Sequence, residues 1–392
     1  MSISLQSTNA NTNLEKTPPI VDKNYYTHKA NIENHIKSKS LQSTNANTNL
    51  EKKPPIVDKN YYTQKANIEN FIKGVYPMFY EQFELNHFVN SGSEGYVYEG
   101  RYKQGSNNQK YAFKFCIKRN ENPKKEKNKF QEISIVKKLH HKNINQILAF
   151  IKMDENSYFS VLELGKHGDL DYFVNKLLKR KILPETCINY LAKQILDALQ
   201  YIHYRCKIIH MDIKQGNILI DSELNPKIID FSAACSYAEF DPEDLVKFPF
   251  IGTGKYIAPE IIKRTHMKIK YAEEIDIYSF GITLFTLAFG IYPYNLNDVK
   301  GKEYEKIWEK VNSENLEFPK DIKVSNKFKD FLSKILEKDY TKRLSIKDAL
   351  KHPWIKAYDI LEEEKQNISN QENFLIKLIT DAIPKFNEYI KN

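Results

Sequence analysis

Cysteine is scarce in this chain and is arranged neither for disulfides nor for a metal. The four cysteines, Cys116, Cys187, Cys206 and Cys235, lie far apart, without a CxxC pair or a histidine at zinc-finger spacing. Disulfide frameworks of small secreted proteins and structural zinc sites both use closely spaced cysteines. The spacing therefore argues against both classes. It favours free thiols in a reducing compartment, so we expect a cytoplasmic protein, with access to the nucleus left open.

Targeting and membrane segments are also missing. The first residues, MSISLQSTNA, have neither an apolar signal core nor the Met-Gly start of a myristoylated protein. The most apolar run, Ile277–Tyr292, approaches the ~17 residues that can span a bilayer. It contains Ser279, Gly281 and Gly290, and Asp276 stands at its start. We therefore expect a buried core helix there and no membrane span.

The chain lacks a concentrated charge of one sign. Its 59 Lys and Arg exceed its 50 Asp and Glu by a net +9, which is spread along the sequence. Nucleic-acid binding would need the basic residues gathered on one element beside a recognisable module, so no such partner is expected. Apolar residues make up 41% of the 392, which suits one large folded unit with extensions. The oligomeric state stays open.

A tandem duplication occupies the N-terminus. Residues 2–37 and 38–73 are copies of one 36-residue unit. Two copies fall short of the ~3 that a solenoid needs. The first half of each copy has no apolar period, and a Pro pair follows it. We predict that residues 1–75 are a mostly disordered extension, in which a short helix of the second copy, with Ile68, Phe71 and Ile72, could dock on the folded domain.

The rest of the chain changes character once, from strands to helices. Strand-like runs lie at Phe88–Tyr98, Gln109–Lys118, Ile147–Met153 and Ser157–Leu164, and a helical pattern lies at Lys124–His140. Beyond Gly168 the patterns are helical, first at Leu170–Leu178 and then at Glu185–Tyr204. We predict a strand-rich lobe over residues 76–165 and a helical lobe over 166–356, joined near Glu163–Gly165. A helical tail over 357–392 is expected to pack on the second lobe.

One stretch, His210–Asp230, combines a potential proton acceptor, a lysine and two oxygen ligands for a metal ion. Asp212, Lys214 and Asn217 stand within six residues, and Asp230-Phe231 closes the stretch. This resembles the catalytic and metal-binding loops of protein kinases, HRDxKxxN…DFG. The resemblance implies that Asp212 aligns the substrate hydroxyl and that Lys214 offsets charge on the transferred phosphoryl group. It also implies that Asn217 and Asp230 hold Mg²⁺.

Two earlier motifs extend the resemblance. VNSGSEGYV, from Val89 to Val97, partly matches the kinase Gly-rich loop, although alone it is equally typical of a hairpin turn with two glycines. YAFK, which ends at Lys114, resembles the strand that supplies the phosphate-binding lysine. A lysine in this apolar context is costly to bury unpaired. We expect Glu132, on the predicted helix, to be its partner.

The resemblance also implies an ATP site. Its members would be Val89, Gly92, Gly95, Val97, Ala112, Lys114, Leu162, Leu219, the hinge residues Glu163, Leu164 and Gly165, and Asp169. The apolar members would enclose adenine, and the hinge backbone would hydrogen-bond it. Asp169 would reach the ribose or a basic substrate side chain.

Downstream motifs indicate a protein substrate. GTGKYIAPE, Gly252–Glu260, resembles the substrate-binding segment, and Thr253 with Lys214 matches the Ser/Thr pattern. Arg343 takes the place of the arginine that pairs with the glutamate of APE, here Glu260. The closing HPWI resembles calmodulin-dependent and cyclic-nucleotide-type kinases. The resemblance, from Phe83 to Lys356, thus implies an α+β, two-lobed protein serine/threonine kinase that uses ATP and Mg²⁺.

Departures from the pattern suggest how the enzyme is switched. Met211 replaces the arginine that pairs with a phosphorylated activation segment, and Pro249 stands where the phosphorylated threonine is frequent. We predict activity without phosphorylation of that segment. Ser232 replaces a glycine, so it should restrict the backbone after Asp230. We do not expect it to touch that carboxylate. Gly216 stands where many kinases that prefer arginine-containing substrates have a glutamate. One acidic side chain that would bind a basic substrate residue is therefore missing.

Two rival functions remain. Asn90, Met211 and Ser232 would fit a pseudokinase scaffold that binds partners without phosphotransfer, but none of the three supplies chemistry. A small-molecule kinase of similar fold is disfavoured, because GTGKYIAPE and Arg343 build a platform for protein substrates. We therefore favour an active protein kinase.

Overall fold

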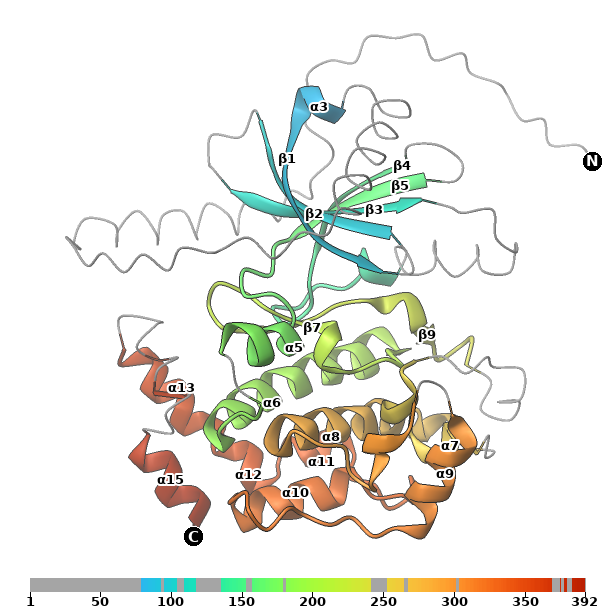
Figure 1. Ribbon diagram of the computed structural model, residues 1–392, viewed down its shortest axis with the longest axis vertical. Helices are drawn as coiled ribbons and strands as arrows, with labels where there is room; N and C mark the ends of the chain where they lie inside the picture. The colour runs from blue at the N-terminus through green and yellow to red at the C-terminus, as the bar shows by residue number, and fades with distance from the viewer. Residues whose placement is uncertain are drawn as a thin grey trace, which may run out of the picture. The chain divides into compact units, whose positions relative to one another are not determined.

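The computed structural model describes residues 79–92, 95–103, 109–117, 135–152, 157–178, 181–240, 252–263, 267–300, 303–368, 374, 377–378 and 383–391 (Figure 1). The chain forms two compact units, Met1–Lys118 with Ile147–Leu162, and Arg119–Gln146 with Glu163–Asn392. The N-terminal repeat and most of the helix predicted over Lys124–His140 lie outside the described residues.

The first unit is a five-stranded sheet in the order β1-β2-β3-β5-β4. Its strands are β1 (Phe83–Gly92), β2 (Gly95–Tyr102), β3 (Lys110–Ile117), β4 (Ile147–Lys152) and β5 (Ser157–Glu163). β1 and β2 pair antiparallel with Gly92 opposite Gly95, so the chain reverses between these glycines. The single strand predicted over Phe88–Tyr98 is therefore wrong. Its β-forming residues belong to two strands, because the glycines between them permit a tight reversal.

Aromatic side chains from one face of this sheet form the core of the first unit. The buried members are Phe79, Phe83, Tyr98, Phe113, Phe115 and Phe159, together with the aliphatic Val161. Phe79, from the short helix α3 (Phe79–Gln82), lies with its ring centroid 5.1 Å from those of Phe83 and Phe159. Successive strand residues alternate between the faces. The aromatic core on one face therefore leaves the other face of the sheet for different residues.

Predicted nucleotide-binding residues occupy that other face. Val97 of β2 pairs with Lys114 of β3, whereas the neighbouring pair, Tyr98 and Phe113, points into the aromatic core. Ala112 shares the face of Lys114, two residues along β3. Leu162 follows the core residue Val161 and so also faces away from the core.

The second unit is mainly helical and is built around α6 (Glu185–Gln200) and α8 (Glu273–Phe289), which pack against each other (Figure 1). Every residue of α8 is buried. The apolar run at Ile277–Tyr292 is thus a core helix over most of its length, as predicted. No helix in the described part of the chain has the length and hydrophobicity to cross a bilayer.

Shorter elements surround these two helices. They are α5 (Leu170–Tyr172), α7 (Pro259–Ile262), α9 (Tyr304–Ser313), α10 (Asn326–Ile335), α11 (Ile346–Ala349), α12 (Pro353–Lys356), α13 (Tyr358–Gln366) and α15 (Pro384–Lys391). The helix predicted over Leu170–Leu178 is α5 continued by a π-helical turn, η1 (Phe173–Leu177). In the same way α6 continues into η2 (Tyr201–Cys206).

The C-terminal residues pack on α6. The Thr186 hydroxyl of α6 donates to the carbonyl of Leu378 at 3.2 Å. Lys365 of α13 donates to the Tyr190 hydroxyl of α6 at 2.6 Å. Trp354 of α12 is fully buried and stacks on Phe328 with ring centroids 4.4 Å apart. These contacts join the tail to the helical unit.

Candidate active site

The candidate catalytic loop lies between two short strands of the second unit, β6 (Ile208–Ile209) and β7 (Ile218–Ile220). β6 pairs with β9 (Cys235–Ser236), and β7 pairs with β8 (Pro226–Ile228). The loop starts on a buried carboxylate. Asp276 of α8 accepts hydrogen bonds from the backbone amides of His210 at 2.7 Å and Met211 at 2.8 Å. Met211 has φ +66, a left-handed conformation that a residue with a Cβ rarely adopts.

His210 ties this loop to the segment that ends at Asp230. Its Nε2 lies 3.0 Å from the carbonyl oxygen of Ile229, and its Nδ1 accepts from the amide of Asp212 at 3.3 Å. A carbonyl can only accept, so the hydrogen bonds assign the ring proton to Nε2. The buried imidazole therefore fixes the backbone on both sides of the site.

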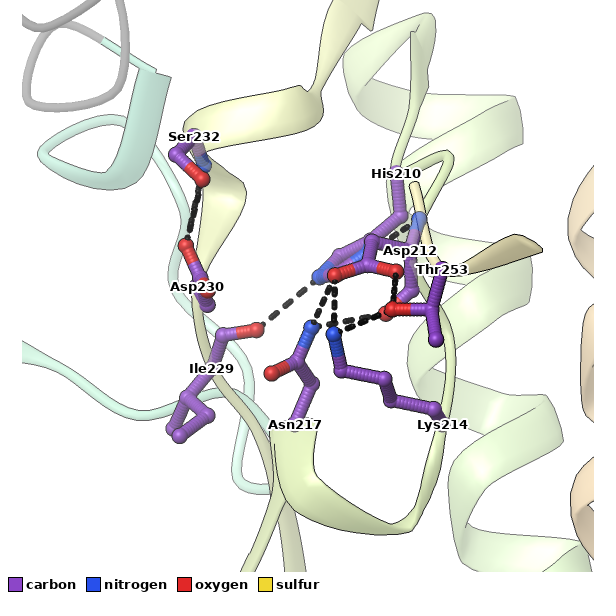
Figure 2. A network of polar contacts seen from close by, with 8 residues as sticks. All are labelled: His210, Asp212, Lys214, Asn217, Ile229, Asp230, Ser232 and Thr253. Atoms are coloured by element: carbon purple, nitrogen blue, oxygen red, sulfur yellow. Dashed lines mark hydrogen bonds and ion pairs between the residues drawn. The ribbon is translucent and has the colours of Figure 1, made fainter. Parts of the chain in front are cut away.

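Three side chains meet at the carboxylate of Asp212 (Figure 2). Lys214 Nζ donates to Asp212 Oδ2 at 2.6 Å and to Thr253 Oγ1 at 2.6 Å. The Thr253 hydroxyl donates to Asp212 Oδ1 at 2.9 Å, and Asn217 Nδ2 donates to Oδ2 at 2.8 Å. Three donors from two segments thus set the orientation of this largely buried carboxylate.

The part of the chain from Asp230 to Glu260 corresponds to the activation segment of the resemblance, and it approaches the catalytic loop closely at Gly252. This residue has φ +102, and a Cβ placed on it would lie 2.6 Å from the carbonyl oxygen of Met211. Only glycine fits such a position. The contact brings Thr253 within reach of Asp212 although 41 residues separate them.

The predicted magnesium ligands fit a metal that is held jointly with phosphates. Asn217 donates its amide nitrogen to Asp212, which leaves the amide oxygen pointing away from that carboxylate (Figure 2). Asp230 follows Ile229, whose amide donates to the carbonyl of Asn217 at 3.0 Å. Among the described residues, no group of three or more His, Cys, Asp or Glu is arranged to hold a metal. One carboxylate and one amide oxygen suit Mg²⁺, which takes few protein ligands beside substrate phosphates.

Ser232 contacts the predicted metal ligand, contrary to our expectation. Its hydroxyl donates to Asp230 Oδ1 at 2.7 Å, and its amide approaches the same oxygen at 3.3 Å (Figure 2). Asp230 is left-handed, with φ +62, and caps the turn that contains Ser232. A serine two residues after an aspartate can make such a bond locally. The replacement of glycine therefore adds a hydrogen-bond donor to the predicted metal ligand.

Removal of this hydroxyl should weaken metal-dependent nucleotide binding. Groups that hydrogen-bond a metal ligand orient it, and their loss lowers metal affinity about tenfold or more. We expect Ser232→Ala to need about tenfold more Mg²⁺ for half-maximal binding of a fluorescent ATP analogue. Ser232→Thr keeps the hydroxyl and should resemble the wild type, as should Ser222→Ala in the exposed β7–β8 turn. Equal Mg²⁺ dependence of Ser232→Ala and wild type would contradict this.

The predicted nucleotide-binding residues are divided between the units. Val89, Gly92, Gly95, Val97, Ala112, Lys114 and Leu162 lie in the first, and Glu163, Leu164, Gly165, Asp169 and Leu219 in the second. The proposed partner of Lys114, Glu132, lies outside the described residues. In the second unit, a Cβ on Gly165 would lie 3.0 Å from Leu219, so the hinge backbone packs directly on that side chain.

Asp169 has a structural role beside its predicted one. Its Oδ1 accepts from the amide of Tyr172 at 2.9 Å and so caps α5. Burial raises the pKa of this carboxyl. The hinge is further anchored by an ion pair between Glu163 and Lys227, with 2.7 Å between Oε2 and Nζ. These protein contacts by themselves hold the backbone after the hinge in place.

The predicted substrate platform contains a buried ion pair. Arg343 donates to both carboxylate oxygens of Glu260, at 2.7 and 3.0 Å, as the motif predicted. Both side chains are almost wholly inaccessible to solvent. Within the same motif Gly254 and Ile257 are also buried.

An antiparallel sheet with an aromatic core and a helical unit that holds an Asp-Lys-Asn-Thr site are the two lobes of a protein kinase fold. The chain belongs to the protein kinase family, because residues 83–355 match the family described as "Protein kinase domain". The predicted fold class and the suspected family are thereby confirmed.

Curated relatives agree with this membership. The chain is 31% identical over 278 residues to the "Cell cycle serine/threonine-protein kinase CDC5/MSD2" of Saccharomyces cerevisiae, with 71% of this chain and 37% of that protein covered. It is 30% identical over 276 residues to "Serine/threonine-protein kinase ULK3" of Mus musculus, with 70% and 54% covered. "Myosin light chain kinase A" of Dictyostelium discoideum is 31% identical over 280 residues, with 70% and 88% covered. The first two relatives extend well beyond the shared region.

Proposed function

We propose that this protein transfers the γ-phosphoryl group of ATP to serine or threonine hydroxyls of protein substrates. The observation that supports this most strongly is the Asp212 carboxylate, held by Lys214, Asn217 and Thr253 (Figure 2). A fixed carboxylate can accept or align the proton of an incoming hydroxyl. An ammonium beside it can offset the negative charge of the transferred group.

The roles of the surrounding residues follow from this. Lys214 Nζ bridges Asp212 and Thr253, so it stands beside the proton acceptor and the substrate-binding segment together. Asn217 and Asp230 would hold Mg²⁺, which would neutralise charge on the ATP phosphates. Lys114 would hold the phosphates with Glu132 as its orienting partner. Thr253 completes a serine/threonine type of site because its hydroxyl contacts Asp212.

We further propose that phosphorylation of the activation segment is not needed for activity. Met211 is buried and apolar, and it is fixed through its backbone amide by Asp276 instead of through a charged side chain. A side chain of this kind offers no charge to a phosphate. Pro249 is the second residue on which this proposal rests, and it lies outside the described residues.

Transfer of labelled phosphate from ATP to a degenerate peptide library tests both proposals. Recombinant full-length protein would be treated with phosphatase, and its phosphorylation state checked by mass spectrometry before the assay. We expect incorporation on serine and threonine, incorporation by Asp212→Asn that is lower by about 10²-fold or more, and no gain after phosphorylation. Equal incorporation by both proteins would refute the catalytic assignment. Activity that appears only after phosphorylation of Ser236, Tyr237 or Thr253 would refute phosphate independence.

A pseudokinase scaffold receives no support from the described residues. Asn90, one of the positions that suggested it, pairs with Val97 between β1 and β2, so the strand pairing holds without a glycine at position 90. Ser232 adds a contact to Asp230 and leaves that carboxylate in place. The described residues therefore favour an active kinase over a pseudokinase scaffold.

A further inference from the structure

The beginning of the activation segment is fixed on the second unit by backbone and ring contacts. β9 pairs with β6, and the amide of Tyr237 donates to the carbonyl of Lys207 at 2.8 Å. The Lys207 ammonium lies 5.8 Å from the centroid of the Tyr237 ring. These contacts place the Tyr237 ring next to η2, the turn that holds His203.

A chain of hydrogen bonds runs from this tyrosine to the catalytic loop. The Tyr237 hydroxyl lies 2.9 Å from His203 Nδ1, and His203 Nε2 lies 2.8 Å from Asp276 Oδ2. Asp276 in turn accepts from the amides of His210 and Met211. His203 and Asp276 are wholly buried. In the part of the chain that the structure describes, neither ring nitrogen of His203 contacts any further polar group.

The protons of this chain can be assigned. Burial alone would raise the pKa of Asp276, but the hydrogen bonds that it accepts from His203 and from the His210 amide outweigh burial, so its pKa is lowered and the group is a carboxylate. His203 must therefore donate from Nε2. Burial and nearby carboxylates raise the pKa of Tyr237, so its hydroxyl keeps its proton and donates to His203 Nδ1.

We infer that Tyr237 is a positioning residue that couples the activation segment to the catalytic loop through His203 and Asp276. The inference deepens the proposed function and rests on it. Asp276 holds the left-handed backbone of Met211, the residue directly before Asp212. Strain of this kind persists only where neighbours enforce it. Tyr237 thus supports the conformation that presents Asp212, and it does so with an uncharged hydroxyl.

This link accounts for a catalytic loop that lacks a phosphate receptor. The activation segment is linked to the loop at two places, indirectly near its start, where Tyr237 acts through His203 and Asp276, and directly at Gly252, which packs against the Met211 carbonyl. Neither contact needs a phosphate or a basic side chain at position 211. A phosphate on Tyr237 would replace the donating hydroxyl with a negatively charged acceptor. That charge would lie across the His203 ring from the Asp276 carboxylate. Its modification should therefore inactivate the enzyme.

Tyr237→Phe tests the inference because it removes one oxygen and keeps the ring. Loss of a buried hydrogen bond that positions a catalytic group should lower kcat about tenfold, with KM for ATP within about twofold. Hydrogen exchange of the His210 and Met211 amides should accelerate in the same variant. Tyr204→Phe is the matched control, since that partly exposed tyrosine neighbours the same region without belonging to the chain. It should leave kcat and exchange unchanged.

The outcomes separate this inference from the proposed function. A Tyr237→Phe enzyme with wild-type kcat and wild-type exchange at His210 and Met211 would overturn the role of Tyr237. Equal losses in Tyr237→Phe and Tyr204→Phe would also overturn it, because the effect would then be general to the region. An inactive wild-type protein would refute the kinase assignment instead. In that case the exchange measurement alone would still decide whether Tyr237 restrains the loop.

Discussion

Replacement of Asp212 with asparagine is expected to lower kcat by about 10²–10⁴-fold, the usual effect of losing a positioned proton acceptor. The variant has nearly the same shape, but one carboxylate oxygen becomes an amide nitrogen that cannot accept a proton or a hydrogen bond. Lys214, Asn217 and Thr253 all donate to that carboxylate. If the amide nitrogen faces Lys214 and Asn217, it meets two donors, and if it faces Thr253, that hydroxyl must change from donor to acceptor. We therefore expect a loss of rate together with some disorder of Lys214 and Thr253.

The measurement should separate chemistry from binding. Steady-state kinetics with saturating peptide would give kcat and KM for ATP, and we expect KM to change less than about threefold, because a group used only in the transition state affects kcat. Asp321→Asn is a suitable control, since Asp321 is exposed and lies far along the chain from the site. A kcat for Asp212→Asn within a few-fold of the wild type would contradict the role of this residue.

The compact part of the site was predictable because its geometry is local. Asp212, Lys214 and Asn217 lie in one loop between two short strands, so their spacing alone brings them together. Thr253 is different, because it lies 39 residues from the lysine that it contacts. No periodicity in the sequence predicts that contact. Only the resemblance of GTGKY to a kinase segment pointed to it.

The hydrogen-bond chain through Tyr237 could not be read from the sequence. Tyr237, His203 and Asp276 come from a strand end, a helical turn and the core helix α8, and neither their spacing nor their neighbours mark them as partners. The contact of Ser232 with Asp230 is a different kind of omission. Serine side chains commonly bond to groups two residues away, so the sequence did contain that signal.

The strands show a similar limit. Alternation correctly indicated that Phe113 and Lys114 point to opposite faces, because the strand period is two residues. Alternation did not show that Phe88–Tyr98 contains a reversal, since aromatic and β-branched residues continue on both sides of Gly92 and Gly95, and only the glycine motif from Val89 to Val97 indicated a turn there. Hairpin turns in such a run depend on backbone freedom at the glycines, which a hydrophobicity pattern does not record.

Replacement of Glu260 with glutamine is expected to be the most destabilising of these changes. The two carboxylate oxygens of Glu260 accept from Arg343, and both side chains are buried, at 1% and 0% exposure. Glutamine keeps the size but leaves the guanidinium without a counter-charge. Breaking a buried pair in this way costs about 3 kcal/mol or more. The expected fall in Tm is roughly 6–12 °C for a unit of this size.

Differential scanning fluorimetry on the full chain would measure this change. Lys342→Gln is the matched control, because Lys342 neighbours Arg343 and forms an exposed pair with Asp339 at 3.2 Å. Exposed pairs contribute little, so its Tm should stay within about 2 °C of the wild type. Similar Tm values for Glu260→Gln and wild type would show that hydration or a rearranged partner satisfies Arg343.

A double replacement would separate charge from hydrogen bonding. Arg343 also donates to the carbonyls of Glu337 and Glu274, each at 2.8 Å, and so joins α7, α8 and the segment after α10. Glu260→Leu with Arg343→Met removes both charges and leaves these two carbonyls without their donor. If the unpaired charge dominates, the double variant should be more stable than Glu260→Gln. If the carbonyl contacts dominate, it should be less stable, and Arg343 would act mainly as a donor that joins three elements.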